Sequence, residues 1–103
     1  MTDKILSMAG LARRAGKISS GGTLCTDAVR KGIAKLVILA ADASENTKKS
    51  IRDSCLTRKI PVVEYADTES LGKCVGCGER AVISVNDKNF AEAILNIYNQ
   101  SFR

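Results

Sequence analysis

Apolar residues recur at helical spacing in several segments of the chain, and these segments alternate with short apolar runs. Ile5, Met8 and Ala12 show this spacing near the start and predict a first helix. Thr2 is its expected cap, and Gly16 is its expected stop. The run at 35–40 (KLVILA) is continuously apolar after Lys35, which is typical of a strand buried on both faces.

The other elements follow from the same spacing and from caps and breakers. We expect helices over 23–31, 45–58 and 67–73 and a last helix after Asp87, with extended segments over 17–20, 62–65 and 80–85. Asp42 and Ser44 compete as the cap of the helix over 45–58. The residues expected on inner helix faces are Thr47, Ile51, Cys55, Phe90, Ala93, Ile94 and Ile97.

Helices and short strands therefore alternate along the whole chain. This order predicts an α/β protein, a three-layer α/β/α sandwich with a central mixed sheet of about four strands. The 103 residues contain no repeat, low-complexity tract or linker, so we expect residues 1–103 to form a single domain.

The cysteines and the start of the chain bear on location. Residues 1–10 include two charges and lack the apolar core of a secretion signal, and the longest apolar stretch, 36–41, is too short to span a bilayer. We therefore expect a cytoplasmic protein with no membrane partner. The cysteines, expected to be reduced thiols, are Cys25, Cys55, Cys74 and Cys77.

Composition narrows the function classes. The chain has no histidine, which argues against Ser-His or Cys-His catalysis, so we expect no enzyme and no cofactor. Sixteen Lys and Arg against eleven Asp and Glu give a net charge of +5, which favours an anionic partner. The alternative is a charge that only keeps the protein in solution.

The first candidate site is the segment 19–23 (SSGGT), which leads into a helix. Gly21 and Gly22 let the backbone approach a ligand, and the first N–H groups of a helix attract phosphate. Arg30 and Lys31 lie about two turns further along. The alternative is an ordinary tight turn capped by Thr23, and no Gly-Lys-Ser/Thr follows to make a Walker loop.

The second candidate is the segment 71–80 (LGKCVGCGER). Its glycines predict a flexible loop, and together with Lys73 and Arg80 they suit contact with a nucleic-acid backbone. The alternative is a plain connection from helix to strand. Cys74 and Cys77 form a C-x-x-C pair there, which suggests a thiol-redox role or a zinc ion bridging two chains as a further, weaker hypothesis.

The third candidate is a basic flank on two helices. Its residues are Arg13, Arg14, Lys17, Lys48, Lys49 and Arg52. Cations near a helix end are also expected from the helix dipole, which is the alternative interpretation for Arg13 and Arg14. The only aromatic residues are Tyr65, Phe90, Tyr98 and Phe102, too few for a base-stacking platform.

Four runs of the sequence resemble the ribosomal protein L-seven-Ae superfamily, whose members bind kink-turn RNA. They are 21–44 (GGTLCTDAVRKGIAKLVILAADAS), 11–17 (LARRAGK), 43–47 (ASENT) and 78–82 (GERAV), and the last three look most like its bacterial YlxQ-like branch. The resemblance implies the same sandwich fold and an RNA-binding, ribosome-associated role, with RNA and ribosomal proteins as the expected partners.

In that family, RNA contacts the positions of Gly21 through Asp27, a basic residue at Lys31, and the loop near 75–80. Taken with the candidates above, the predicted RNA-binding residues are Gly21, Gly22, Thr23, Asp27, Arg30, Lys31, Lys73, Val75, Gly76 and Arg80. The family's Asn-Glu-x-x-Lys motif, which reads guanines, is Thr23-Leu24-x-x-Asp27 here. The resemblance therefore implies RNA binding more strongly than kink-turn specificity.

The leading hypothesis is RNA binding without catalysis, through a glycine-hinged helix start and a neighbouring loop that together form a cationic cradle. The second hypothesis is a protein-interaction module on the same fold. The third is the thiol-redox or zinc-binding protein built on the C-x-x-C pair.

Overall fold

A mixed four-stranded sheet forms the middle of the molecule in residues 3–101, the part of the chain that the computed structural model describes. Its strands, in the spatial order β1-β4-β2-β3, are β1 (Ile18–Ser20), β2 (Leu36–Leu39), β3 (Val62–Glu64) and β4 (Val82–Val85). β4 pairs antiparallel with both β1 and β2, whereas β2 and β3 run parallel.

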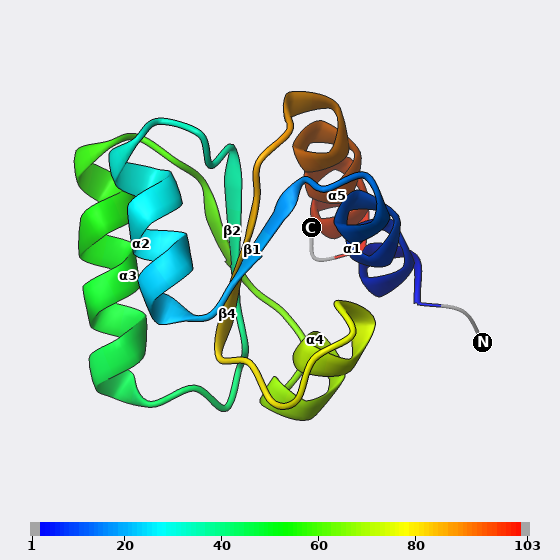
Figure 1. The fold of residues 1–103 in the computed structure, drawn as a ribbon, viewed down its shortest axis with the longest axis horizontal. Coiled ribbons are helices and arrows are strands. Elements are labelled where there is room, and N and C mark those ends of the chain that lie inside the picture. The colour runs from blue at the N-terminus through cyan, green and yellow to red at the C-terminus, as the bar shows by residue number, and fades with distance from the viewer. Residues whose placement is uncertain (1–2, 102–103) are drawn as a thin grey trace.

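Helices cover both faces of this sheet (Figure 1). One face carries α2 (Gly22–Arg30) and α3 (Glu45–Thr57), and the other carries α1 (Lys4–Arg14), α4 (Thr68–Cys74) and α5 (Lys88–Ser101). The predicted three-layer α/β/α sandwich is confirmed. No helix within residues 3–101 has the length and apolar character needed to cross a bilayer.

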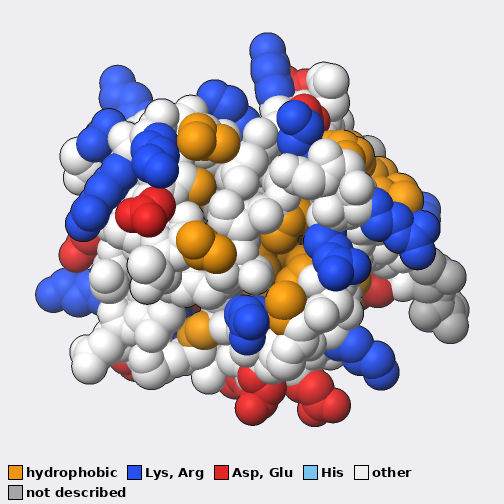
Figure 2. Space-filling view, in the orientation of Figure 1, with side chains coloured by type: hydrophobic (Ala, Val, Ile, Leu, Met, Phe, Trp, Pro, Cys, Tyr) orange, Lys and Arg blue, Asp and Glu red, His pale blue; other side chains and the backbone are white. Residues whose placement is uncertain are grey.

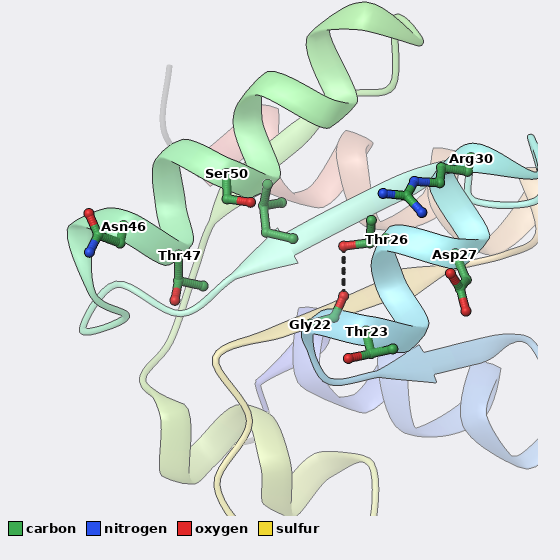
Figure 3. A pocket seen from close by; sticks show the side chains of 9 residues that line it. Gly22, Thr23, Thr26, Asp27, Arg30, Asn46, Thr47 and Ser50 are labelled. Atoms are coloured by element: carbon green, nitrogen blue, oxygen red, sulfur yellow. Dashed lines mark hydrogen bonds between the residues drawn. The ribbon is translucent and has the colours of Figure 1, made fainter.

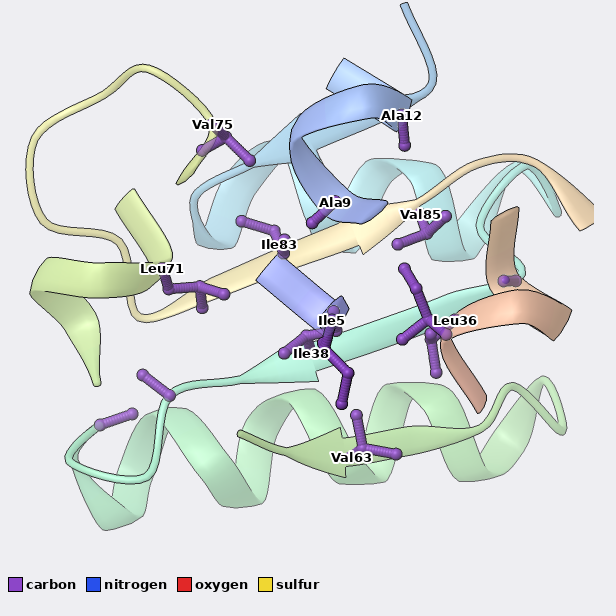
Figure 4. Close-up of a cluster of buried hydrophobic side chains, with 14 residues drawn as sticks. Ile5, Ala9, Ala12, Leu36, Ile38, Val63, Leu71, Val75, Ile83 and Val85 are labelled. Carbon is purple, nitrogen blue, oxygen red and sulfur yellow. The ribbon is translucent and has the colours of Figure 1, made fainter. Parts of the chain in front are cut away.

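The central strand β2 supplies both halves of the core. Leu36 and Ile38 face α1 and α5, whereas Val37 and Leu39 face α2 and α3, and all four are fully buried. Figure 4 shows the first of these two clusters. The apolar run predicted to be a strand buried on both faces is confirmed, because successive side chains of a strand point to opposite sides.

The side chains that cap α1 and α5 can be compared with the caps predicted from the sequence. Asp3 caps α1, its Oδ1 accepting from the Leu6 N–H at 3.0 Å; the predicted cap Thr2 lies outside the described residues. The predicted Asp87 cap is confirmed, since its carboxylate accepts from the N–H of Phe90 at 3.0 Å.

Ser44 caps α3, and its competitor Asp42 serves another helix. The Ser44 hydroxyl accepts from the Thr47 N–H at 3.2 Å. Asp42 Oδ1 accepts from the N–H of Thr68 at 2.8 Å, at the start of α4. Asp42 therefore ties two loops that lie far apart in the sequence.

The inner face of α5 differs slightly from the prediction. Ala91 and Ile94 are its buried residues, while Ala93 is half-buried. Phe90 and Ile97 pack against the core from the sides, as partly buried residues. The inner stripe is centred on Ala91 and Ile94, one turn apart, so the prediction was wrong in giving Ala93 the place of Ala91.

Candidate nucleic-acid interface

The pairing of β1 with β4 brings the two main candidate segments together. Ser20 at the end of β1 lies opposite Ile83 near the start of β4, because the two strands run antiparallel. The N–H of Gly21 donates to the carbonyl of Val82 at 3.0 Å and extends this pairing past the strand. The start of α2 and the loop that precedes β4 therefore share one edge of the sheet.

The helix start lacks a side-chain cap. Gly21 is the N-cap residue, and its φ of 91° and ψ of 157° suit glycine. The prediction that Thr23 begins or caps this helix is wrong, because α2 already begins at Gly22 and no side chain bonds its first N–H groups. The N–H groups of this first turn remain available to an anion, at the positive end of the helix dipole.

The loop that follows α4 is fixed by backbone hydrogen bonds. The N–H of Cys77 donates to Gly72 O at 2.9 Å, and the N–H of Arg80 donates to Thr68 O at 3.0 Å. A Cβ on Gly72 would lie 1.8 Å from the carbonyl oxygen of Gly78, so the chain folds back tightly on α4. The segment expected to be a flexible loop is therefore held against α4 by these contacts.

Val75 is the one predicted contact residue whose side chain the structure places in the interior. It is 2% exposed and belongs to the core cluster with Ala9, Leu71 and Ile83 (Figure 4). Its side chain is therefore not exposed to a ligand, so a contact with RNA at this position would have to use the backbone. An apolar residue beside glycines looks like a loop residue in the sequence, but here it anchors the loop to α1 and β4.

A cleft of about 380 Å³ lies between the helix start and this loop. Its lining residues are Ser20, Gly21, Gly22, Thr23, Leu24, Glu79, Arg80 and Ala81. Arg80 donates from Nη1 to the carbonyl of Glu79 at 2.9 Å, and Glu79 Oε2 accepts from the Thr68 hydroxyl at 3.3 Å. One cation and one carboxylate line the cleft, so the expected cationic cradle is electrically balanced.

A larger groove of about 510 Å³ runs between α2 and α3 and shares Gly22 and Thr23 with the cleft. Its other lining residues are Thr26, Asp27, Arg30, Asn46, Thr47, Ser50 and Ile51. In Figure 3, Thr26 and Arg30 point from α2 towards α3, and the Thr26 hydroxyl donates to Gly22 O at 2.8 Å. Five of the residues that line the groove carry a neutral hydroxyl or amide group, and Asp27 and Arg30 contribute one charge of each sign.

The structure separates the remaining predicted residues from the cleft. Lys31 is the C-cap residue of α2 and is exposed at the opposite end of that helix. Lys73 and Gly76 line a third groove, together with Arg13 and Arg14 at the end of α1. The sequence placed Arg13 and Arg14 in the basic flank, with the helix dipole as the alternative. Nothing local indicates that the end of α1 lies beside the loop after α4.

One carboxylate, that of Glu64, pairs with two of the three cations of the predicted basic flank on α3. Lys48 Nζ lies 3.1 Å from Glu64 Oε1 and also donates to the carbonyl of Ala41 at 2.8 Å, while Arg52 pairs with the other oxygen of Glu64. The hydrogen bond from Lys48, with both neighbouring cations, holds the pKa of the Glu64 carboxyl below its usual range. This flank is therefore a weaker phosphate site than its sequence indicates.

The thiols have environments that suit structural cysteines. Burial raises the pKa of Cys25 to about 12 and that of Cys74 to about 11, and the Cys74 thiol donates to Leu71 O at 3.1 Å. High thiol pKa values disfavour the thiolate that redox and metal chemistry need. Within residues 3–101, no group of three or more His, Cys, Asp or Glu side chains is placed to hold a metal ion.

Figure 2 shows how the surface charge is distributed on the face that carries α2 and β1. Lys and Arg side chains lie on both sides of a central area with exposed apolar side chains, and acidic side chains gather at the bottom edge. Leu24, in the first turn of α2, is 57% exposed and lines the cleft. The face thus combines separate cations with a central area where apolar side chains are exposed.

Comparison with known proteins identifies relatives over most of the chain. A sequence model of the ribosomal protein L7Ae/L30e/S12e/Gadd45 family matches residues 3–95. The RNA-binding protein YlxQ of Bacillus subtilis (strain 168) is 39% identical over 88 residues, which cover 85% of this chain and 88% of that protein. The RNA-binding protein YlxQ of Enterococcus faecium is 36% identical over 89 residues, covering 86% and 85%.

Solved structures share the fold. A protein of unknown function from Bacillus halodurans C superimposes with a TM-score of 0.91 at 37% identity, covering 95% of this chain and 99% of that one. The 15.5kD RNA binding protein of Giardia lamblia superimposes with a TM-score of 0.79 at 19% identity, covering 97% and 89%. At that lower identity, the second likeness concerns the fold alone.

Proposed function

The chain belongs to the ribosomal protein L7Ae/L30e/S12e/Gadd45 family, and from this premise we propose that it is a non-catalytic protein that binds structured RNA. The proposed site is the cleft between the start of α2 and the loop before β4. The observation that carries the proposal is the adjacency of an uncapped helix start at Gly22 and the Arg80 loop along one sheet edge.

The cleft offers three kinds of contact to RNA. Backbone N–H groups of the first α2 turn suit a phosphate oxygen, and the Thr23 hydroxyl can bond a phosphate or a ribose. The exposed Leu24 side chain offers an apolar surface to an unstacked base. Arg80 adds a guanidinium group from the other wall.

Recognition in this cleft would rest on the shape and backbone of the RNA. A side chain that recognises the edge of a guanine base needs hydrogen-bond donors or acceptors at fixed positions, and the Leu24 side chain has neither. Asp27, which lines the neighbouring groove, repels phosphate. We therefore propose that the bound RNA is structured but need not be a kink-turn. We further propose that it is part of ribosomal RNA and that binding takes place in the cytoplasm.

Crosslinking in cells, followed by sequencing of the attached RNA, tests the proposal and identifies the ligand. A Gly22→Glu variant places a carboxylate at the helix start, where a Cβ meets nothing within 4 Å, and Gly22→Gln is its matched neutral control. We expect crosslinking to fall strongly for Gly22→Glu and much less for Gly22→Gln, since acidic residues at a helix start are tolerated by the fold. Equal RNA recovery from Gly22→Glu and the unmodified protein would contradict the proposed site.

A protein-interaction role is the second candidate, favoured by the groove between α2 and α3 with its neutral hydroxyl and amide lining. Such a surface suits polar contacts with a folded ribosomal protein. Affinity capture from lysate with and without nuclease separates the two functions. Partners that disappear after nuclease treatment support RNA binding, whereas partners that persist support the protein interface.

A further inference from the structure

We propose that bound RNA extends beyond the cleft into a second, basic groove between the end of α1 and the end of α4; this inference rests on the proposed function. The groove has a volume of about 390 Å³. Its lining residues are Ser7, Gly10, Leu11, Arg13, Arg14, Lys73, Cys74 and Gly76. The ligand would be the ribose-phosphate backbone of the strand already held in the cleft.

The cleft and the groove differ in net charge, and each would have a different role in RNA binding. The cleft carries Arg80 against Glu79, so it contributes little net attraction for a polyanion. The groove carries Arg13, Arg14 and Lys73, and no carboxylate stands among the described residues that line it. Attraction of phosphate would therefore come mainly from the groove, while the cleft would position the RNA.

The three cations of the groove are not engaged elsewhere in residues 3–101. None of them makes an ion pair or a side-chain hydrogen bond with another described residue. Compensation of the helix dipoles alone would favour contacts with terminal carbonyls, as Lys35 makes with Gly32 O at 3.1 Å beyond the end of α2. The guanidinium and ammonium groups of the groove remain available to phosphate.

The loop of residues 75–80 joins the groove to the cleft. Gly76 lies on the groove side and Arg80 on the cleft side, four residues apart. A Cβ on Gly76 would lie 2.8 Å from Cζ of Arg13, so this guanidinium sits directly over the glycine backbone. A Cβ on Gly10 would lie 3.3 Å from the carbonyl of Cys74, so α1 packs closely on the end of α4. The groove is therefore a fixed continuation of the cleft wall.

Salt-dependent binding of two matched variants tests the inference. Arg13→Gln/Arg14→Gln/Lys73→Gln removes the charges of the groove. The control Lys49→Gln/Arg58→Gln/Lys59→Asn removes the same charge from exposed positions on and after α3, and asparagine suits the φ of 58° at residue 59. The probe is a fluorescent RNA hairpin with a kink-turn internal loop, titrated at several salt concentrations beside poly(U).

For the groove variant we expect a log K against log salt slope that is shallower by roughly 2 to 3, with little change for the control. An equal change in both variants, or none in either, would overturn the inference while leaving cleft binding intact. Absence of binding by the unmodified protein to either probe at low salt would instead contradict the recognition of the RNA backbone on which the proposed function rests. The double variant Arg14→Gln/Lys73→Gln keeps Arg13 over Gly76, so a shallower slope there excludes a loosened loop as the cause.

Discussion

The carbonyl oxygen of Gly78 lies 1.8 Å from the point where a side chain on Gly72 would begin. This approach folds the loop before β4 back on α4, and the hydrogen bond from Cys77 N–H to Gly72 O at 2.9 Å holds it there. Since the same loop forms one wall of the proposed RNA cleft, the shape of the site depends on a glycine that does not line it.

Gly72→Ala should therefore damage both stability and binding. The added methyl group would overlap backbone atoms, so the loop must move, at a cost of about 1–3 kcal/mol in the free energy of unfolding. Gly78→Ala is the matched control, because a Cβ there meets nothing within 4 Å and its φ is not left-handed. Urea unfolding and RNA titration measure the two effects, and equal stability of both variants would contradict this account.

Arg80→Ala should weaken RNA binding and change its salt dependence. If the protein contacts about four phosphates, log K should fall with log salt at a slope of roughly −3 to −4, and loss of one contact should make it shallower by about one. Arg52→Ala is the control, since Arg52 already pairs with Glu64. If the binding constant of the unmodified protein does not change with salt concentration, electrostatic RNA binding is rejected.

Leu24→Glu combined with Asp27→Lys should increase the affinity for a kink-turn RNA. The double change restores a hydrogen-bonding side chain on the cleft and replaces a repulsive carboxylate with a cation. Leu24 is 57% exposed, so its replacement removes little core packing. Gel-shift titration against the unmodified protein measures the gain, and the absence of any gain would place the RNA site elsewhere.

Alkaline pH should destabilise the fold. Burial and a 2.6 Å hydrogen bond to Asp3 raise the pKa of Tyr65 from 10.0 to about 12, and burial raises that of Cys25 from 9.0 to about 12. The folded state thus holds these protons more tightly than the unfolded state, so their stabilisation is complete below pH 9 and is lost as pH rises towards 12. Urea midpoints across this range should fall, and less steeply for Tyr65→Phe.

The thiols should react slowly in the folded protein. Burial raises the pKa values of Cys25, Cys55 and Cys74, which keeps these groups protonated at neutral pH. We expect a chromogenic disulfide reagent to modify these three only after unfolding in guanidinium. Rapid modification of Cys74 in the native protein would contradict this prediction and support the thiol-redox hypothesis.

Several features of the fold follow from the sequence because their causes are local. The run 36–40 is apolar at every position and fully buried, which is typical of a strand covered on both faces. The ends of α1 and α2 precede Gly16 and Gly32, which adopt the left-handed conformation that stops a helix. Alternation of such elements then limits the layers to a small number of arrangements, of which the sandwich is one.

The candidate site was predictable only in its parts. The sequence identified Gly21, Gly22 and Arg80 as suitable for contact with a phosphate backbone, but their adjacency depends on the antiparallel pairing of β1 with β4. Strands separated by about sixty residues pair through the burial of the whole sheet, and no local periodicity encodes that choice.

Tertiary structure alone decided the electrostatics and the shape of the interface. Glu79 balances the charge of Arg80 in the cleft, and Glu64 pairs with Lys48 and Arg52 of α3. Arg13 lies over the Gly76 backbone, although the two residues are far apart in the sequence. Val75 is buried in the core cluster that includes Ala9, although it follows α4 in a glycine-containing loop. Sequence fixes how many charges a protein has, but the attraction between charges depends on distance and burial, which only the folded chain sets.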